Sequence, residues 1–519
     1  MIYTCFQSIR QRTDKKEAQK NLDFIRNFPL FTIVLSLFSG VLCTVFKGRT
    51  ARIYTAVYEC FLTALVSCVL WYTMKTGTSF TYVMGEFPAP WGNEIRAGTL
   101  EAVIALLFLV VLFSSVVGGW NFVSTDIDES KINLYYGLIN LMTAALMAMT
   151  WTNDLFTGYV FLEILTLTSC GILIVREIGR TTLAAVRYMI MNLLGSALFL
   201  LGVVLLYDIT GHLLMVPMRE QIGLLIQDPG NRMILTLAVG ILTIGLGIKS
   251  GLFPFYFWMP DTYGWATPTS ASILSALVSK CYLFLLIKIY WRVVGIDMFQ
   301  QMPIRNLLLV LGMCGIVFGS LSALRAGNIN RMTAFSAAAQ IGYIYMGIGI
   351  GGEIGYTAAI FHIFAHAVTK SMLFLTTPRL AAVSEDSLLF RKLTGSGLRD
   401  KNAGIYFMVS AFSMIGIPMF AGFSSKIMFG VAAVRAGSVR EMVMVIIVLA
   451  LSSSLNAYYF IRTIIRLYTR SDPGRRVRPV RHRLSYNIPM ILLTAANLLL
   501  GLGSVAIVDM IQRGLEMFS

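Results

Sequence analysis

Three ionisable side chains recur at four-residue intervals in the stretch FHIFAHAVTK, which spans residues 361–370: His362, His366 and Lys370. Four residues advance an α-helix by about 400° and about 6 Å, so a helix stacks these three side chains on one face over roughly 12 Å. An unperturbed histidine titrates at about pH 6.5, and a lysine removed from water can release its proton near neutral pH. The spacing therefore favours proton transfer along the helix, from the middle group to either neighbour through a water molecule.

Two other interpretations of this stretch stay open. The spacing His-x3-His is also a zinc-ligand spacing on helices. No third ligand lies nearby in the same stretch, and Lys370 would repel a cation, so zinc is disfavoured. A buried histidine can also simply hydrogen-bond the backbone of a neighbouring helix.

Four more ionisable residues lie inside apolar runs: Glu163, Lys249, Lys280 and Lys426. A charge at bilayer depth costs roughly 2.5–3.5 kcal/mol on insertion scales, and such residues are functional by default. We predict a line of titratable groups through successive helices that translocates protons, with a Glu163–Lys249 pair that forms and breaks. The alternatives are a static Glu163–Lys249 salt bridge and a Lys426 that faces a cytoplasmic vestibule.

Four other charged residues are expected near the ends of membrane spans: Glu59, Glu101, Lys288 and Arg292. Long charged side chains in such places commonly bury their stems and extend their charged ends into water. We therefore expect these four side chains to reach solvent and to take no part in the line of buried groups.

The composition explains why the buried charges stand out. The chain has 519 residues, of which 56% are hydrophobic and 13% charged, and its apolar runs recur at about 20 residues each. This is typical of a polytopic helical membrane protein, since continuous apolar runs lack the alternation of a membrane barrel.

The net charge of +16 fits basic cytoplasmic loops better than nucleic-acid binding. The seven cysteines are scattered without a CxxC spacing, which disfavours iron–sulfur and zinc-ribbon sites. No cleavable signal peptide is evident.

We predict fourteen membrane-spanning helices, numbered helix 1 to helix 14. Their approximate ranges are 28–46, 53–73, 98–117, 134–151, 155–175, 183–207, 233–258, 269–291, 306–323, 333–350, 355–377, 404–430, 441–466 and 485–509. Arginine and lysine gather in the loops after odd-numbered helices, which predicts that these loops are cytoplasmic and that both termini face outward. The basic N-terminal tail QRTDKKEAQK opposes this orientation, and it could form an amphipathic or partner-binding surface helix.

Two predicted spans contain helix-breaking residues. Helix 7 reads LTIGLGIKSGLFPFYFWMPD and holds Pro254, while helix 12 reads SMIGIPMFAGFSSKIMFG and holds Pro418. Proline inside a helix removes a hydrogen bond and kinks or breaks the helix. The two spans are five helices apart, and this odd offset indicates inverted repeats, helices 4–8 and helices 9–13. The predicted domains are 1–27 (basic tail), 28–133 (helices 1–3), 134–291 (first unit), 292–466 (second unit) and 467–519 (basic loop and helix 14).

Four blocks of the sequence stand out together: GIKSGLFPFYFWMPDTYGWATPTSASILSALVSK, NINRMTAFSAAAQIGYIYMGIGIG, FHIFAHAVTKSMLF and GIPMFAGFSSK. They resemble the antiporter-like subunits of respiratory complex I, of Mrp cation/proton antiporters and of membrane-bound group 4 hydrogenases. A further block, VLLYDITGHLLM, is most similar to the Mrp D-type branch. The resemblance covers about residues 100–470. It implies fourteen helices with two inverted five-helix units, which agrees with the helices and repeats predicted from the residues.

The resemblance also assigns transport roles and partners. It implies proton transport by a glutamate in helix 5, lysines in helices 7 and 8, histidines and a lysine in helix 11, and a charged residue in helix 12. These positions carry Glu163, Lys249, Lys280, His362, His366, Lys370 and Lys426. The resemblance implies that this chain holds no cofactor and that its partners are other membrane subunits of the same complex. Proton transport would be driven by iron–sulfur, hydrogenase or quinone-module subunits, or by a sodium gradient. The complex would lie in a prokaryotic cytoplasmic membrane. The family's distal complex I subunit has a long lateral helix that we do not expect here, so the parent complex stays open.

Two other classes of function are carried forward. A stand-alone solute transporter would need a central pocket for an organic substrate and no partners. A structural scaffold would use its buried charges only to pair helices, so neutral substitutions would change stability and not ion flux. A membrane enzyme is least expected, since the sequence shows no nucleophile triad or metal cluster. Protons are favoured over sodium, because sodium needs several hard oxygen ligands and the buried set is mostly lysine and histidine.

Overall fold

The computed structural model describes residues 24–87, 92–226, 229–436, 438–470 and 484–518. Most of the predicted basic N-terminal tail and most of the basic loop that precedes helix 14 lie outside the described residues. The surface helix expected in that tail therefore stays a prediction.

The described chain is almost wholly α-helical, and its first half runs as far as the end of predicted helix 8. The helices of this half are α2 (Phe28–Val45), α3 (Gly48–Thr76), α4 (Thr99–Gly118), α5 (Trp120–Asp126), α6 (Ile132–Trp151), α7 (Leu155–Ile174), α8 (Gly179–Thr210), α9 (Met215–Leu225), α10 (Pro229–Ser250), α11 (Met259–Trp265), α12 (Pro268–Ile273) and α13 (Ser279–Ile289). Strands β1 (Phe80–Val83) and β2 (Glu94–Ala97) form an antiparallel hairpin between α3 and α4.

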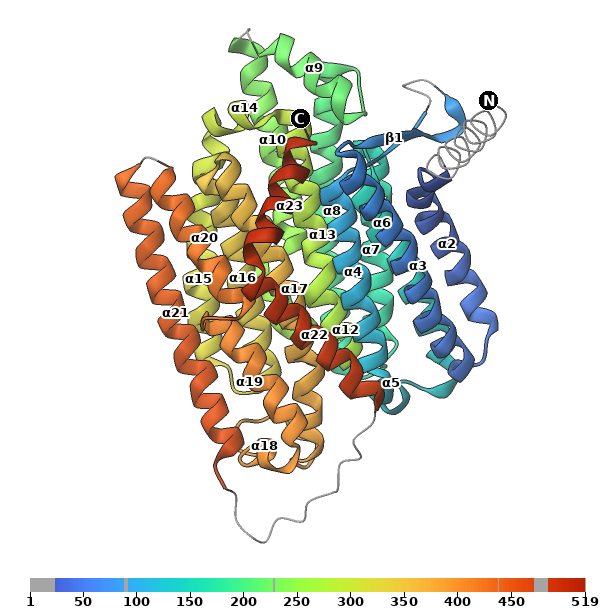
Figure 1. The fold of residues 1–519 in the computed structure, drawn as a ribbon, viewed down its shortest axis with the longest axis vertical. Coiled ribbons are helices and arrows are strands. Elements are labelled where there is room, and N and C mark those ends of the chain that lie inside the picture. The colour runs from blue at the N-terminus through green and yellow to red at the C-terminus, as the bar shows by residue number, and fades with distance from the viewer. Residues whose placement is uncertain (1–23, 88–91, 227–228, 437, 471–483, 519) are drawn as a thin grey trace, which may run out of the picture.

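The second half begins with the short helix α14. Its helices are α14 (Ile296–Gln301), α15 (Pro303–Arg325), α16 (Ile329–Ile350), α17 (Gly352–Ala382), α18 (Ser396–Arg399), α19 (Lys401–Ile415), α20 (Ala421–Arg435), α21 (Val439–Tyr468), α22 (Leu484–Leu502) and α23 (Ser504–Glu516). Figure 1 shows α22 and α23 running obliquely across the bundle, where they contact α4 and α17.

Twelve helical stretches of the described chain are long and apolar enough to cross a membrane, so the protein is an all-α, multi-pass membrane protein. Two predicted spans fall outside this set for different reasons. α16 is long enough, but its first half, INRMTAFSAAAQ, is rich in small and polar residues. Predicted helix 12 is divided into α19 and α20, each of 15 residues.

Local sequence signals explain where several helices begin and end. Asp154, Asn328 and Asp400 each accept a hydrogen bond from a backbone N–H in the first turn of the helix that follows, with Asp154 Oδ1 2.6 Å from Thr157 N. Such caps satisfy backbone donors that the helix leaves free. Gly77 and Gly211 end α3 and α8 in the left-handed conformation that glycine adopts without strain.

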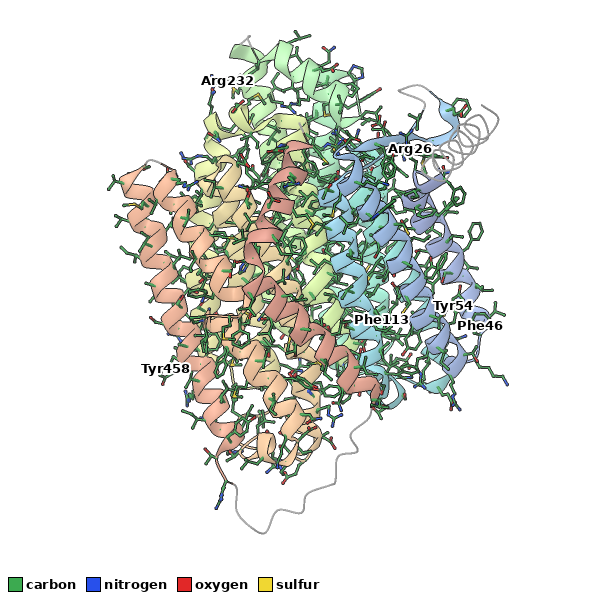
Figure 2. The ribbon with its side chains drawn as sticks, viewed as in Figure 1. Arg26, Phe46, Tyr54, Phe113, Arg232 and Tyr458 are labelled. Carbon is green, nitrogen blue, oxygen red and sulfur yellow. The ribbon has the colours of Figure 1, made fainter. Side chains whose placement is uncertain are left out.

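The most buried helices stand in the middle of the bundle. In α17, and in residues 268–294, which include α12 and α13, every residue of the apolar 18-residue stretch is buried. Figure 1 shows α2 and α3 at one edge of the molecule and α21 at the other. The outer helices present large hydrophobic side chains to the surroundings. Tyr458 of α21 is 57% exposed, and Figure 2 shows it at the outer edge of the bundle. Charged side chains on a helix in the middle of the bundle are therefore shielded from both water and lipid.

Two predicted membrane spans are interrupted near Pro254 and Pro418, the prolines at which the sequence predicts breaks. α10 ends at Ser250, and Pro254 precedes a short 3-10 turn, Phe255–Trp258, before α11. α19 ends at Ile415, and Pro418 lies in the connection that precedes Phe420, the N-cap of α20. Backbone groups at such interruptions are free to bind side chains or ions, because they lack helical partners.

Glycines let α8 and α10 approach each other closely. A β-carbon at Gly195 of α8 would lie 2.8 Å from Gly245 O and 2.9 Å from Lys249 Cγ. Both distances are shorter than a normal contact, so only glycine fits at Gly195. This close approach sets the position of Lys249 relative to α7 and α8.

Candidate functional site

The first pair of predicted residues meets between α7 and α10. Lys249 Nζ lies 3.8 Å from Glu163 Oε1 and donates a hydrogen bond of 2.7 Å to Thr166 Oγ1, one turn further along α7. The lysine side chain is fully buried, whereas the glutamate side chain is 25% exposed at the outer face of α7. The ammonium group therefore stands between a carboxylate that faces outward and a hydroxyl that faces inward.

Thr166 links this pair to α13. Its hydroxyl lies 3.3 Å from Tyr282 Oη, and Lys249 Nζ lies 5.4 Å from the centre of the Tyr282 ring. Tyr282 follows Lys280 by two residues on α13. Hydroxyl groups of this kind both donate and accept hydrogen bonds, so they can connect Lys249 with the interior of the bundle.

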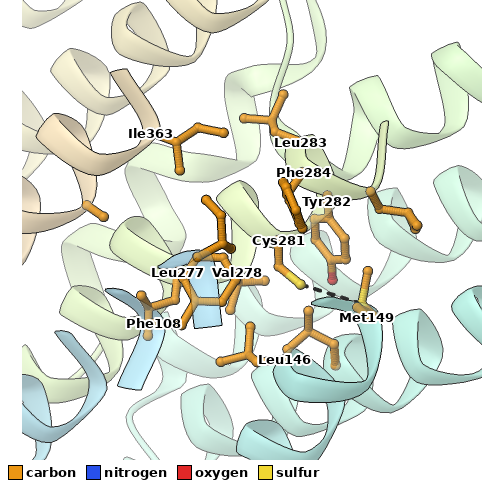
Figure 3. Packing of buried hydrophobic residues seen from close by; sticks show 14 of the residues in the cluster. Phe108, Leu146, Met149, Leu277, Val278, Cys281, Tyr282, Leu283, Phe284 and Ile363 are labelled. Atoms are coloured by element: carbon orange, nitrogen blue, oxygen red, sulfur yellow. Dashed lines mark hydrogen bonds between the residues drawn. The ribbon is translucent and has the colours of Figure 1, made fainter. Parts of the chain in front are cut away.

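Lys280 is completely buried at the start of α13. Its ammonium group donates to the carbonyl of Ser275, within the π-helical turn Leu274–Val278, and to Ser279 Oγ at 3.1 Å. π-helical turns are rare and frequently occur at functional sites. Figure 3 shows the apolar packing around the neighbouring residues of this segment, in which Cys281 Sγ lies 3.8 Å from Met149 Sδ.

The three ionisable residues of α17 share one buried face. The His362 and His366 rings are stacked with their centres 6.0 Å apart. His362 Nδ1 lies 2.7 Å from Ser425 Oγ of α20, and Lys370 Nζ donates to Thr333 O and Ser336 Oγ of α16, both at 2.9 Å. Neither ring nitrogen of His366 has a hydrogen-bond partner among the described residues.

Lys426 lies on α20, across a small cavity from His362 and His366. The cavity is also lined by Gln340, Thr369 and Ser413, and it has room for about one water molecule. Lys426 Nζ donates to Ile415 O at 2.7 Å, to Met414 O at 3.2 Å and to Ser453 Oγ at 3.0 Å. These two carbonyls belong to the last turn of α19, so the interruption of predicted helix 12 supplies acceptors for the lysine.

Electrostatic repulsion joins the central groups into one set. Lys280 of α13 repels Lys370 and both histidines of α17, and Lys426 of α20 repels His362. A positive charge on one group therefore disfavours a positive charge on the next. The seven predicted residues fall into an outer pair, Glu163 and Lys249, and a central set that extends to Lys426. Within the described residues, no group of three His, Cys, Asp or Glu side chains is placed to hold a metal ion.

The expectation that four charged side chains near span ends reach water is wrong. Glu59, Glu101, Lys288 and Arg292 are all at most 1% exposed. Arg292 Nη1 lies 3.5 Å from Glu101 Oε1, and Lys288 Nζ donates to Thr150 O at 2.9 Å and Thr152 O at 2.5 Å. Glu59 Oε1 accepts a hydrogen bond of 2.9 Å from Thr143 Oγ1 of α6.

These four residues are buried because the elements that cover them come from distant parts of the chain. α3 runs for 29 residues and extends beyond both ends of the predicted span, so Glu59 lies well inside it. The ring of Phe518, near the C-terminal end, lies 5.4 Å from the Arg292 guanidinium. Lys288 and Arg292 lie in the segment Pro268–Val294, whose apolar stretch is wholly buried. The apolar character of this segment was the sequence feature that could have predicted their burial.

Neutral polar residues around the ionisable groups were also missed by the sequence patterns. Thr166, Ser336 and Ser425 each contact one predicted residue, and Gln340 lines the small cavity. Only Thr166 carried a sequence signal, since it lies one helical turn from Glu163 on the same face. The others belong to helices whose neighbours the sequence alone does not reveal.

Known proteins are similar in sequence to most of this chain. The family described as NADH:quinone oxidoreductase/Mrp antiporter, transmembrane region, matches residues 152–453. The NADH-quinone oxidoreductase subunit N of Desulforudis audaxviator (strain MP104C) is 32% identical over 451 residues, which cover 84% of this chain and 85% of that protein. The D-type subunit of the Na(+)/H(+) antiporter of Bacillus subtilis (strain 168) is 25% identical over 500 residues, which cover 95% of this chain and 97% of that protein.

Solved structures share the fold along nearly the whole chain. A chain of the membrane-bound sulfane sulfur reductase, an archaeal respiratory membrane complex, has a TM-score of 0.83 at 23% identity and covers 96% of this chain and 97% of its own. A chain of the Mrp complex from Dietzia sp. DQ12-45-1b has a TM-score of 0.83 at 21% identity, over 95% of this chain and 97% of its own. The protein is thus a multi-pass helical membrane protein whose fold is shared with chains of these two complexes. It belongs to the NADH:quinone oxidoreductase/Mrp antiporter transmembrane family.

Proposed function

We propose that the chain is the proton-translocating, antiporter-like subunit of a multisubunit ion-pumping membrane complex. The observation that carries the proposal is the set of ionisable side chains on α7, α10, α13, α17 and α20, of which five are buried between helices. Buried ionisable groups are expensive in a membrane and mark ion pathways. Two relatives, a quinone oxidoreductase subunit N and a D-type subunit of a sodium/proton antiporter, support the same function.

Protons move in this mechanism by changes of partner. When Lys249 is drawn to Glu163, the carboxylate stabilises the protonated ammonium group; when it turns to Thr166, that stabilisation is lost and the proton passes inward. Repulsion within the central set then moves charge from Lys280 through the α17 residues to Lys426. Half-channels to the two sides open beside the interruptions at Pro254 and Pro418. Glu163, partly exposed at the outer face of α7, couples the chain to its neighbour.

The proposed architecture has fourteen spans and two inverted five-helix units, residues 134–291 and 292–466. Corresponding helices have corresponding neighbours, which supports this division. In the first unit α6 contacts α7, α7 contacts α8, α8 contacts α10 and α13 contacts α10 and α6. In the second unit the same pattern joins α15 to α16, α16 to α17, α17 to α19 and α20, and α21 to α20 and α15. Residues 28–133 and 467–519 flank the two units.

The loops after odd-numbered spans are basic, which favours a cytoplasmic location for these loops. Both termini then lie outside, and the membrane is a prokaryotic cytoplasmic membrane. α2 begins and α23 ends at the same end of the bundle in Figure 1, as this orientation requires. Partners are other membrane subunits of the complex, both antiporter-like and small hydrophobic ones, joined to a redox module or driven by a sodium gradient. The chain needs no cofactor for this role.

The small cavity bears on the alternative of a solute transporter. It lies among His362, His366 and Lys426, where a central substrate would be bound, and has room for about one water molecule. That space suits a proton relay and is too small for an organic solute. The ionisable groups around it are nitrogen donors, which favours protons over sodium.

Replacing Lys249 with alanine tests the proposal. Membrane vesicles that contain the complex are energised, and proton uptake is followed with a pH-sensitive dye. We expect Lys249→Ala to abolish proton uptake while the chain still co-purifies with its partner subunits. The matched control is Lys401→Ala, which removes an exposed lysine at the start of α19. Normal proton uptake by Lys249→Ala would overturn the mechanism, and the subunits that co-purify identify the parent complex.

A further inference from the structure

A basic cavity opens between α15, α21 and the segment that follows α17, away from the central ionisable residues. Its volume is about 510 Å³. Four arginines line it: Arg325 at the end of α15, Arg391 after α17, and Arg462 and Arg466 on α21. No acidic residue is among the described residues that line it. Four positive charges thus converge on one cavity from three segments that are distant in the sequence.

These guanidinium groups are free to bind a ligand. Within the described part of the chain, none of the four makes a hydrogen bond or an ion pair through its side chain. Arg466 only lies over the ring of Phe390, 5.6 Å from its centre. Two other arginines have protein partners. Arg379 Nε lies 2.8 Å from Asp400 Oδ2, and Arg399 Nε donates a hydrogen bond to Val383 O. Among the described residues, other arginines are therefore paired with protein acceptors, and these four are not.

Apart from Thr463, the rest of the cavity wall is made mostly of apolar and aromatic side chains. Leu324, Met332 and Leu389 line it beside Phe390 and Tyr459. Arg462 follows Tyr458 by four residues, so both side chains lie on one face of α21, and both are exposed. Figure 2 shows Tyr458 on the outer edge of the bundle, toward the end where α21 finishes. Tyrosine and arginine in this arrangement are typical of the boundary between lipid and water.

We propose that this cavity binds the headgroup of an acidic phospholipid. Guanidinium groups bind phosphate oxygens through paired hydrogen bonds, and basic pockets between membrane helices select anionic lipids. The apolar walls beside the arginines accommodate the glycerol backbone and the first methylenes of the acyl chains. A soluble phosphate would leave those walls in contact with water. The proposal is independent of proton translocation, since none of the central ionisable residues lines the cavity.

Native mass spectrometry of the complex in mild detergent tests the proposal. The complex is titrated with phosphatidylglycerol, with phosphatidylcholine of the same chain length, and with phosphatidylglycerol in the presence of inorganic phosphate. We expect phosphatidylglycerol to bind more tightly than phosphatidylcholine and inorganic phosphate to compete poorly. The double variant Arg462→Gln/Arg466→Gln should weaken phosphatidylglycerol binding roughly thirtyfold, since each arginine near an anionic headgroup contributes roughly fivefold.

Two further variants make the result interpretable. Arg435→Gln/Arg440→Gln removes two exposed arginines near the opposite end of α21 and should leave lipid binding unchanged. Arg462→Lys/Arg466→Lys keeps the charge and should retain part of the affinity, because lysine lacks the paired donors. Unchanged phosphatidylglycerol binding in the glutamine double variant would overturn the proposal. So would equal competition by inorganic phosphate, or cross-linking of the cavity to a partner subunit.

Discussion

Lys249 Nζ is closer to Thr166 Oγ1, at 2.7 Å, than to Glu163 Oε1, at 3.8 Å. The charge pair is therefore extended beyond hydrogen-bond length while the lysine is held by a neutral hydroxyl of the same helix as the glutamate. A tight salt bridge would hold the proton on the lysine, whereas this geometry lets the ammonium group move between two partners on α7. The arrangement supports a pair that alternates over one that only locks two helices together.

Removing the Thr166 hydroxyl tests this alternation. Thr166→Val keeps the shape of the side chain and leaves Lys249 with Glu163 as its partner. We expect proton uptake to fall roughly two- to twelvefold, the range that corresponds to one hydrogen bond of about 0.5–1.5 kcal/mol. The matched control is Thr168→Val, because among the described residues the Thr168 hydroxyl donates only to the backbone of its own helix. Equal uptake by Thr166→Val and the unmodified complex would contradict the alternation.

Ser425 provides a second test, at the far end of the central set. Its hydroxyl lies 2.7 Å from His362 Nδ1 and fixes the orientation of that ring beside the small cavity. Ser425→Ala should lower proton uptake roughly two- to twelvefold with little change in thermal stability. The neighbouring Ser424 donates instead to Gly501 O at 3.1 Å, toward α22, so Ser424→Ala is the matched control. The same loss of uptake in both variants would point to general disturbance of α20.

The sequence predicted the helices well because a membrane span stands out as an apolar run. Each predicted range overlaps a helix or a helix pair of the structure. The sequence also singled out the ionisable residues, since Lys280 or His366 inside such a run is unexpected. It could not predict which groups meet. The contact of Lys249 with Thr166 depends on how α7 and α10 pack, and that packing rests on close approaches such as Gly195 against Gly245.

The failures were at the ends of the spans, where the covering elements are remote in sequence. Glu101 was expected to reach water, yet Gly98 N donates to its carboxylate at 3.1 Å and Arg292 comes from nearly 200 residues away. Arg292 itself lies within the π-helical turn Tyr290–Val294. Neither the turn nor the contact is a property of the local residue pattern.

The buried Glu101–Arg292 pair leads to a prediction about stability. Replacing one partner leaves the other buried and unpaired, which costs about 3–5 kcal/mol in such sites. Glu101→Leu should therefore lower the melting temperature of the detergent-solubilised protein strongly, and Glu101→Leu/Arg292→Leu should recover much of the loss. The exposed pair Asp509–Arg513, with its atoms 3.0 Å apart, is the control, since surface pairs contribute little. Additive losses in the double variant would contradict coupling of the two residues.

Gly195 links packing to the lysine and yields a last prediction. A β-carbon there would lie 2.9 Å from Lys249 Cγ and 2.8 Å from Gly245 O, so Gly195→Ala must push α8 away from α10 or displace the lysine. Overpacking of this kind costs roughly 1–3 kcal/mol, and we expect a melting temperature lower by a few degrees. Proton uptake should fall as well, because a displaced Lys249 no longer stands between Glu163 and Thr166. Gly223→Ala in α9 is the matched control, since nothing lies within 4 Å of its β-carbon position. If Gly195→Ala lowers stability but leaves proton uptake per folded complex unchanged, the exact position of Lys249 is not what limits transport.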